Sequence, residues 1–183
     1  MNFLIIDNND SFTLNLRHLI AQSDGRLPDV IPYEAINTAD FAAYDIIVIS
    51  PGPGKPEEYP NYRRLFESGK PIIGICLGMQ VMAIYFGGEV DRLPDCFHGR
   101  TEDIEFDGKT LAVARYHSLA VTRVPDCFDV ISRNSSSVPM AIAHKTLPII
   151  GFQFHPESFL TENGNTFIDY ALTFIDRHIT RPV

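Results

Sequence analysis

Hydrophobic and polar positions follow different patterns in the two halves of the chain. In the first half, short uninterrupted apolar runs predict buried strands at 3–6, 46–49 and 72–75, and a weaker run predicts another at 30–33. Between these runs, four apolar residues recur at helical spacing: Phe12, Leu16, Leu19 and Ile20. Strands without alternation, separated by helices, indicate a parallel sheet that is covered on both faces.

Capping and turn residues suggest where the helices begin and end. Asp10 and Ser11 are N-cap candidates for the first helix. A short helix is predicted at 62–68, and a longer one at 77–86, which a pair of glycines would end.

The second half of the chain contains more strands, at 111–114, 119–122, 129–132, 141–144 and 149–154. A final helix places these residues on one face: Ile168, Ala171, Leu172 and Ile175, with Phe167 and Phe174 beside them. The whole pattern predicts an α/β fold, a doubly wound and mostly parallel sheet with helices on both faces and some antiparallel additions. Since no linker-like segment divides the chain, residues 1–183 are expected to form a single domain.

Composition is that of a folded protein without a nucleic-acid or membrane surface. Apolar residues make up 45% of the 183 residues and charged residues 21%, a balance typical of soluble globular chains. Acidic residues outnumber basic ones by 23 to 15, which gives a net charge of −8. This excess argues against nucleic acids and anionic membranes as partners, because they bind basic surfaces.

Cysteine usage and the N-terminal sequence predict a reducing, cytoplasmic location. The three cysteines, Cys76, Cys96 and Cys127, form no C-x-x-C pair, so neither a disulfide framework nor a zinc site is expected. We interpret Cys96 and Cys127 as packing residues. The start of the chain lacks the basic region of a secretion signal. The uncharged stretch 71–88 approaches the length of a membrane span, but its glycines favour a buried strand leading into a buried helix.

The strongest chemical signal is the segment Gly74-Ile75-Cys76-Leu77-Gly78, between a predicted strand and a predicted helix. It has the pattern G-x-nucleophile-x-G, a sharp turn that exposes a nucleophile above the sheet. Glycines are needed because side chains two positions away on either side would clash. The helix N-terminus favours a thiolate at Cys76, and the backbone N–H of Leu77 could stabilise an oxyanion. A buried structural cysteine is the less favoured alternative.

A cysteine nucleophile needs a base, and His155 is the best candidate among the six histidines. It follows the apolar strand at 149–154, at the carboxyl end where α/β sites form. Glu157 lies two residues further on, and in an extended segment both side chains share a face. The carboxylate could therefore hold the imidazole in one tautomer. An exposed His-x-Glu pair without function is the alternative.

Turn-like sequence singles out one loop and two more histidines. The loop 50–56, SPGPGKP, follows the strand at 46–49 and could offer backbone N–H groups to an anion or a carbonyl oxygen. It does not match a phosphate-binding P-loop, and a rigid turn is the alternative. Turn residues also surround His98 and His117, which stay candidates. The remaining histidines are expected in solvent or at a strand end: His18, His178 and His144.

Taken together, these motifs resemble one enzyme family. The elbow at 74–78, the loop at 51–54 and the segment 152–158, FQFHPES, are similar to those of class I, triad-type glutamine amidotransferases. Further segments resemble one branch, the glutamine-hydrolysing component (component II) of anthranilate synthase and aminodeoxychorismate synthase: DNNDSFT at 7–13, HGR at 98–100 and RYHSL at 115–119. The motifs occur in the family's order and span nearly the whole chain. The resemblance implies a flavodoxin-like fold.

The resemblance also implies a reaction. Cys76 would attack the carboxamide of L-glutamine, His155 would transfer protons, and Glu157 would orient His155. The resemblance assigns stabilisation of the oxyanion to Leu77 and to the loop residues Gly52, Pro53 and Gly54. It assigns glutamine binding to Gln80, Ser118 and Leu119. Water would release glutamate from a thioester, and ammonia would pass to a chorismate-using synthase subunit (component I) in tryptophan or folate biosynthesis. No cofactor or metal is expected in this subunit.

Two departures from the family pattern bear on activity and assembly. Where the family has His after Leu-Gly, this chain has Met79, which could alter packing behind the elbow or the coupling to a partner. The usual His-Gly-Lys reads HGR at 98–100. Our hypothesis is that this loop faces the synthase, and unchanged complex formation and activity in Arg100→Ala would count against it.

Two alternatives stay open at this point. One is a stand-alone cysteine hydrolase on a similar fold, such as a γ-glutamyl peptidase or a thioesterase. The stretch 116–119 and the small size argue against it. The other is a binding subunit that has lost its chemistry, which the intact Cys76, His155 and Glu157 make less favoured. Whether the partner makes anthranilate, aminodeoxychorismate or both is also open.

Overall fold

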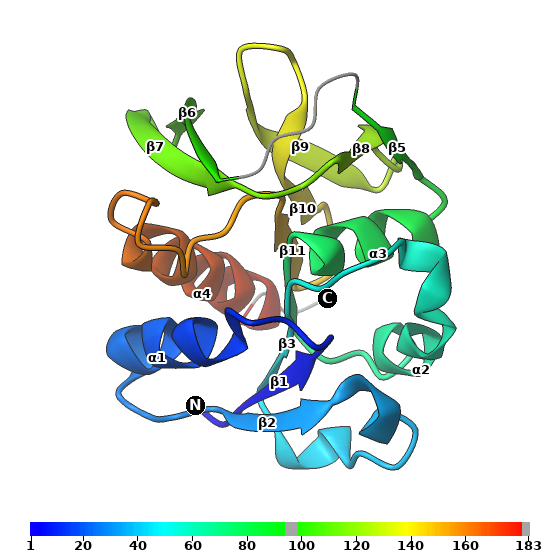
Figure 1. Cartoon of the computed structure of the whole chain (residues 1–183). Coiled ribbons are helices and arrows are strands. Elements are labelled where there is room, and N and C mark those ends of the chain that lie inside the picture. The colour runs from blue at the N-terminus through cyan, green and yellow to red at the C-terminus, as the bar shows by residue number, and fades with distance from the viewer. Residues whose placement is uncertain (94–98, 181–183) are drawn as a thin grey trace.

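The computed structural model describes residues 1–93 and 99–180 and is built around a seven-stranded sheet (Figure 1). The sheet contains, in spatial order, β2 (Asp29–Pro32), β1 (Phe3–Asp7), β3 (Ile46–Ile49), β4 (Ile72–Ile75), β11 (Ile149–Phe152), β10 (Pro139–His144) and β9 (Phe128–Arg133). The first five are parallel and follow the 2-1-3-4-5 order of flavodoxin-like sheets. The last two are antiparallel additions. The predicted fold class is confirmed.

Helices cover both faces of this sheet (Figure 1). One face carries α1 (Thr13–Asp24) and α4 (Asn165–Ile179), and the other carries α2 (Arg63–Phe66) and α3 (Leu77–Tyr85). Neighbouring strand residues alternate between the two cores: Ile5 packs with α1 and α4, whereas Ile6 packs with α3. Because both faces are buried, the strands are apolar throughout, and the sequence shows uninterrupted runs.

Four further strands form two antiparallel pairs beside the main sheet (Figure 1). β5 (Glu89–Arg92) pairs with β8 (Leu119–Arg123), and β6 (Arg100–Phe106) pairs with β7 (Lys109–Arg115). The β6–β7 hairpin packs Phe106 into the core beside α4. Neither β5 nor β6 is predicted from the sequence, because both are mostly charged and bury few side chains.

Some predicted boundaries differ from the observed ones. Asp10 and Ser11 are not N-caps, since α1 begins at Thr13 and Phe12 is its N-cap residue. The side chain of Asp10 instead stabilises the turn before the helix, where its Oδ1 accepts a hydrogen bond from the backbone N–H of Phe12 at 2.8 Å. The helix predicted at 62–68 is the single turn α2. β11 stops at Phe152, before the predicted end at 154.

Two glycines let α3 lie directly against the sheet. A Cβ atom added at Gly78 would lie 2.6 Å from the carbonyl oxygen of Ile49, and one added at Gly74 would lie 2.7 Å from the carbonyl carbon of Gly78. Real Cβ atoms essentially never come this close to other heavy atoms. The first turn of α3 is therefore in contact with β3 and β4, and this places Cys76 at the carboxyl edge of the sheet.

Gly78→Ala is expected to destabilise the protein by about 1–3 kcal/mol, because the added methyl group has no room against Ile49. In an uncrowded helix the same change would stabilise by about 0.5–1 kcal/mol, so the sign separates packing from helix propensity. Urea unfolding measures the difference, with Gln22→Ala on the exposed side of α1 as the control. A stabilised Gly78→Ala protein would contradict this packing.

Candidate active site

Cys76 lies at the turn between β4 and α3. Its backbone has φ 52° and ψ −102°, which a non-glycine residue adopts only where the surrounding structure enforces it. The side chain is mostly buried, at 7% exposure. Leu77 begins α3, and an N–H group in the first turn of a helix has no intrahelical acceptor. The geometry is that of the predicted nucleophile elbow.

His155 and Glu157 form a buried pair just beyond β11. Nδ1 of His155 lies 2.7 Å from Oε1 of Glu157, and both residues are buried. The His155 N–H donates to the carbonyl of Ala114, and the Thr161 hydroxyl donates to the carbonyl of His155. Since the carboxylate accepts the Nδ1 proton, Nε2 of His155 is the atom left for proton transfer.

The charge state of His155 depends on its two neighbours. Burial lowers the pKa of His155, but Cys76 and Glu157 together raise it well above its usual value. Its buried Nε2 makes no hydrogen bond of good geometry with the described residues, and Cys76 is the side chain that interacts with it from that direction. Such contacts are often loose in ligand-free sites and tighten when substrate binds. The raised pKa favours the imidazolium form of His155.

Two aromatic rings enclose the imidazole. Tyr116 packs edge-on against His155 with the ring centroids 5.0 Å apart, and Phe12 lies 6.0 Å from the same ring. The Tyr116 hydroxyl lies 3.0 Å from the hydroxyl oxygen of Ser158. Phe12 comes from the turn before α1, so the segment 7–13 contributes a cover over the base. Excluding water strengthens the ionic interactions beneath it.

The loop that follows β3 is fixed by buried hydrogen bonds. Asn8 donates from its backbone N–H to Ser50 Oγ and from its side-chain amide to the Ser50 carbonyl, each at 2.9 Å. Tyr62 donates its hydroxyl to Asn8 Oδ1 at 2.6 Å, and burial raises the pKa of Tyr62 well above its usual value. A Cβ atom added at Gly52 would lie 2.5 Å from Asn8 Cβ, so only glycine fits there.

Cys76 opens into a cavity of about 220 Å³. Its walls are formed by Gly52, Pro53, Gly54, Leu77, Gln80, Tyr116, His117, Ser118 and Leu119. All seven residues proposed from the sequence for oxyanion and substrate binding are therefore brought together around Cys76. The cavity shares Gly54, Ser118 and Leu119 with a larger groove of about 810 Å³. A space of this size suits a small molecule rather than a polymer.

His117 has the opposite charge state from His155. Its Nε2 accepts a hydrogen bond from Nε of Arg115 at 3.1 Å, so its Nδ1 donates to the carbonyl of Leu119, 2.8 Å away. Burial and the Arg115 charge lower the pKa of His117 to about 3, so the ring is neutral at physiological pH. Arg115 is itself buried and ion-paired with Glu102 of β6. His117 thus holds one wall of the cavity.

Met79, where the family has His, lies behind the elbow rather than in the cavity. Its side chain is fully buried, and a Cβ atom added at Gly151 of β11 would lie 2.9 Å from Met79 Cβ. Met79 does not line the space around Cys76. The departure from the family pattern therefore concerns core packing beneath the nucleophile.

The other candidates from the sequence lie away from the cavity or outside the described residues. His18 is exposed on α1, and His144 ends β10 between the rings of Phe86 and Phe128. Cys127 is partly buried beside the core. The expectations for Cys96 and His98 fall on residues outside the described ranges.

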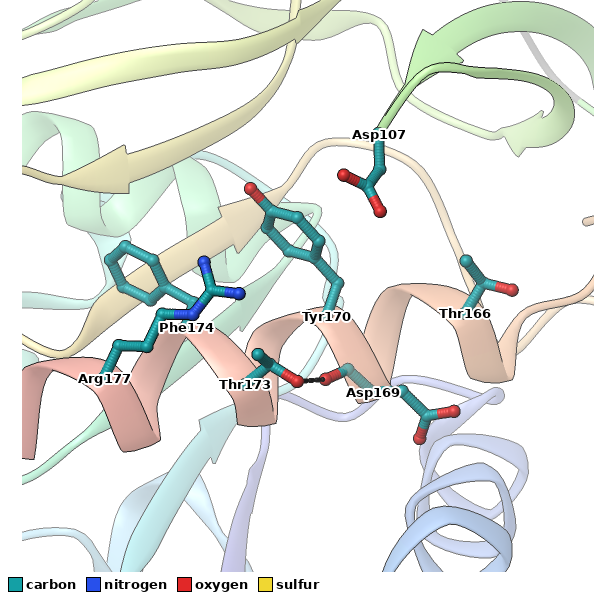
Figure 2. Close-up of a pocket in the computed structure, with 7 residues that line it drawn as sticks. All are labelled: Asp107, Thr166, Asp169, Tyr170, Thr173, Phe174 and Arg177. Carbon is teal, nitrogen blue, oxygen red and sulfur yellow. Dashed lines mark hydrogen bonds between the residues drawn. The ribbon is translucent and has the colours of Figure 1, made fainter.

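A hollow along α4 carries no comparable chemistry (Figure 2). It has a volume of about 400 Å³ and is lined by Asp107, Thr166, Asp169, Tyr170, Thr173, Phe174 and Arg177. In Figure 2 the hydrogen bond along the helix joins the Thr173 hydroxyl to the carbonyl of Asp169. None of these residues is a cysteine or histidine that could serve as nucleophile or base.

Within residues 1–93 and 99–180, no group of three or more His, Cys, Asp or Glu side chains could hold a metal ion. In the same ranges, no helix has the length and apolar character needed to cross a membrane.

Tyr116 and Gln153 are among the residues near Cys76 that the sequence does not single out. Tyr116 packs on the base, and Gln153 lies with its amide nitrogen 3.7 Å from the Cys76 sulfur. Both lie inside the segments 115–119 and 152–158 that carry the family resemblance. Their position inside these segments is the sequence feature that could have identified Tyr116 and Gln153 as site residues.

The chain is similar in sequence to known proteins. The chain is 41% identical to the aminodeoxychorismate/anthranilate synthase component 2 of Bacillus subtilis, over 90% of this chain and 92% of that protein. It is 40% identical to an aminodeoxychorismate synthase of Streptomyces griseus over 97% of this chain, but it spans only 27% of that relative.

The structural comparison and the family comparison both find glutamine amidotransferases. A solved glutamine amidotransferase from Thermotoga maritima shares the fold, with a TM-score of 0.71 at 17% identity over 97% of this chain and 83% of that one. Residues 4–173 match the family described as "Glutamine amidotransferase class-I". Because this match covers nearly the whole chain, the chain belongs to the class-I glutamine amidotransferase family.

Proposed function

We propose that this chain is a glutaminase subunit that hydrolyses L-glutamine to glutamate and delivers ammonia to a chorismate-using synthase. The observation that carries the proposal is the buried His155–Glu157 pair, coupled by charge to Cys76 at a small cavity. The partner class is supported by the name of the Bacillus subtilis relative, a component 2 of aminodeoxychorismate and anthranilate synthase.

The first half of the reaction forms a thioester. The Cys76 thiolate attacks the side-chain carbonyl carbon of glutamine, which forms a carbon–sulfur bond and an oxyanion. Backbone N–H groups of Leu77 and of the loop at 52–54 stabilise the oxyanion. Nε2 of His155 gives its proton to the departing nitrogen, the carbon–nitrogen bond breaks, and ammonia leaves.

The second half hydrolyses the thioester. Neutral His155 takes a proton from water as the water oxygen bonds to the acyl carbon. The carbon–sulfur bond then breaks, the thiolate–imidazolium pair returns, and the carboxylic acid gives its proton to solvent and leaves as glutamate. Glu157 keeps its hydrogen bond to Nδ1 throughout, so the same Nε2 serves both halves. Neither half calls for a cofactor, because N–H groups polarise the carbonyl and one imidazole moves the protons.

Delivery to a partner fits the position of the cavity. Most ammonia that escapes into neutral water becomes ammonium, which is not a nucleophile, so direct transfer keeps the reactive form that a high concentration of ammonium salt would otherwise have to supply. The groove that shares Gly54, Ser118 and Leu119 with the cavity is the surface that such a partner would cover. The synthase would use the ammonia to aminate chorismate to anthranilate or aminodeoxychorismate.

Cys76→Ala is expected to reduce glutamate release from glutamine by roughly 10⁴-fold or more, because the covalent step is lost. With a purified anthranilate or aminodeoxychorismate synthase subunit present, the variant should block amination with glutamine but not with added ammonium salt. Cys127→Ala is the matched control and should retain release. Glutamate release that persists in Cys76→Ala would contradict the mechanism, and release that never couples to either synthase would contradict the partner.

Glu157→Gln is expected to reduce kcat/KM by roughly 10²–10⁴-fold, because the imidazole loses the group that fixes its tautomer. It should also move the alkaline fall of activity to lower pH. Glu157 raises the pKa of His155, so without the carboxylate the imidazolium loses its proton sooner as pH rises. The pH profile of glutamate release measures this. An alkaline limb that stays in place would show that another group controls it.

His117→Asn is expected to raise KM for glutamine roughly tenfold with a smaller change in kcat, because Asn is too short to bridge Arg115 and the Leu119 carbonyl. Steady-state kinetics at several pH values above 5 measure the effect, and His117 stays neutral across that range. His18→Asn on the surface of α1 is the matched control. A loss confined to kcat would argue for a role in the chemical step instead.

A further inference from the structure

Gln153 is a fully buried amide beside the nucleophile. It follows β11, has no exposed surface, and its backbone N–H donates to the carbonyl of Met140 at 2.8 Å. A buried amide is costly unless both its oxygen and its nitrogen find partners. Nε2 of Gln153 lies 3.7 Å from the sulfur of Cys76, within hydrogen-bond range for sulfur, and its Oε1 lies 3.2 Å from Nε2 of Gln80.

The direction of these hydrogen bonds is fixed by a backbone carbonyl. The Leu119 oxygen can only accept, so the Gln80 group 2.9 Å from it is the amide nitrogen. That nitrogen also points at Gln153, which must therefore present its oxygen to Gln80. The remaining face of the Gln153 amide, its NH₂ group, is then the one directed at the Cys76 sulfur. Turning the Gln153 amide over would set two donors against each other, and turning the Gln80 amide over would set its oxygen against two acceptors.

We propose that Gln153 is a catalytic hydrogen-bond donor to the Cys76 sulfur, and that it favours the thiolate both before attack and when sulfur is the leaving group. The role in turnover rests on the proposed glutaminase function, whereas the contact between donor and sulfur does not. An N–H group stabilises a sulfur that carries negative charge more than it stabilises a neutral thiol or thioester.

Both halves of the reaction use this difference. In the first half, only the thiolate can give its electron pair to the carbonyl carbon. The Gln153 N–H group favours the thiolate and so lowers the fraction of unreactive thiol. In the second, the carbon–sulfur bond breaks and its electron pair returns to sulfur, where the Gln153 N–H meets it. His155 carries the proton in each half, and Gln153 itself exchanges none.

The same amide links the nucleophile to the substrate cavity. The Gln80 amide nitrogen is occupied by the Leu119 carbonyl and by Gln153, and its Oε1 has no protein donor among the described residues. Gln80 lines the cavity, so its Oε1 is available to a donor on the substrate, such as the α-ammonium group of glutamine. A substrate bound there contacts the residue that orients the donor to sulfur.

The test measures the thiol directly. Gln153→Met keeps the length of the side chain but removes the donor, and Gln153→Glu keeps its shape but places a carboxylate beside the sulfur. Each variant and the unmodified sequence would be alkylated with iodoacetamide between about pH 5 and pH 9, and modification of the Cys76 and Cys127 peptides would be followed by mass spectrometry. Cys127 is the internal reference, because it lies away from the cavity.

We expect alkylation of Cys76 at neutral pH to fall roughly tenfold in Gln153→Met, and further in Gln153→Glu, with the half-maximal rate moved to higher pH. The Cys127 profile should not change, and kcat for glutamine should fall with Cys76 reactivity more than KM rises. Unchanged Cys76 profiles in both variants would overturn the proposal.

Two further outcomes are distinguishable. If both variants fail to fold, Gln80→Met removes the partner that orients the Gln153 amide, and it should shift the Cys76 profile in the same direction by a smaller amount. No shift there would overturn the proposal. If the profiles shift as expected but the unmodified protein releases no glutamate from glutamine, with or without a synthase, then the proposed function fails and the donor–sulfur contact stands.

Discussion

A buried imidazolium needs nearby groups that offset the cost of its burial, and the site is organised to meet this condition at His155. Glu157 lies 2.7 Å from Nδ1, and Cys76 and Glu157 together raise the pKa of His155 well above its usual value despite burial. The backbone of the base is tied to β7 through Ala114, and the ring of Tyr116 covers it. The proposed nucleophile follows β4 and the proposed base follows β11, and these strands are neighbours in the sheet. The parallel topology is what brings them to one edge.

Two histidines in this site show how environment selects a role for one residue type. His155 lies between two acidic groups and carries charge, so it can give and take protons. Burial and, second to it, the neighbouring guanidinium of Arg115 lower the pKa of His117 and keep it neutral, so it acts as a fixed donor and acceptor. Active sites commonly hold two titratable groups in different protonation states, so that each can serve a different role.

The features predicted from the sequence are those that local pattern determines. The buried strands, the elbow at Cys76 and the His155–Glu157 pair each lie within a few consecutive residues, and the structure has them where expected. The charged strands β5 and β6 escape prediction because they are stabilised by pairing partners and bury little apolar surface. The roles of Gln153 and of Asn8 also escape it, since they depend on contacts with Cys76 and Tyr62, which are 77 and 54 residues away in sequence.

The walls of the cavity come from three distant stretches of chain, the loop after β3, the start of α3 and the turn between β7 and β8. No one of them encloses a space alone. The cavity therefore depends on the central strands: if β3, β4 or β11 separates from the sheet, Cys76 loses its place beside His155, beside Gln153 or beside the cavity walls. Loss of Cys76 reactivity would coincide with unfolding of the central sheet, so chemical labelling of this one sulfur reports the integrity of the whole α/β layer structure.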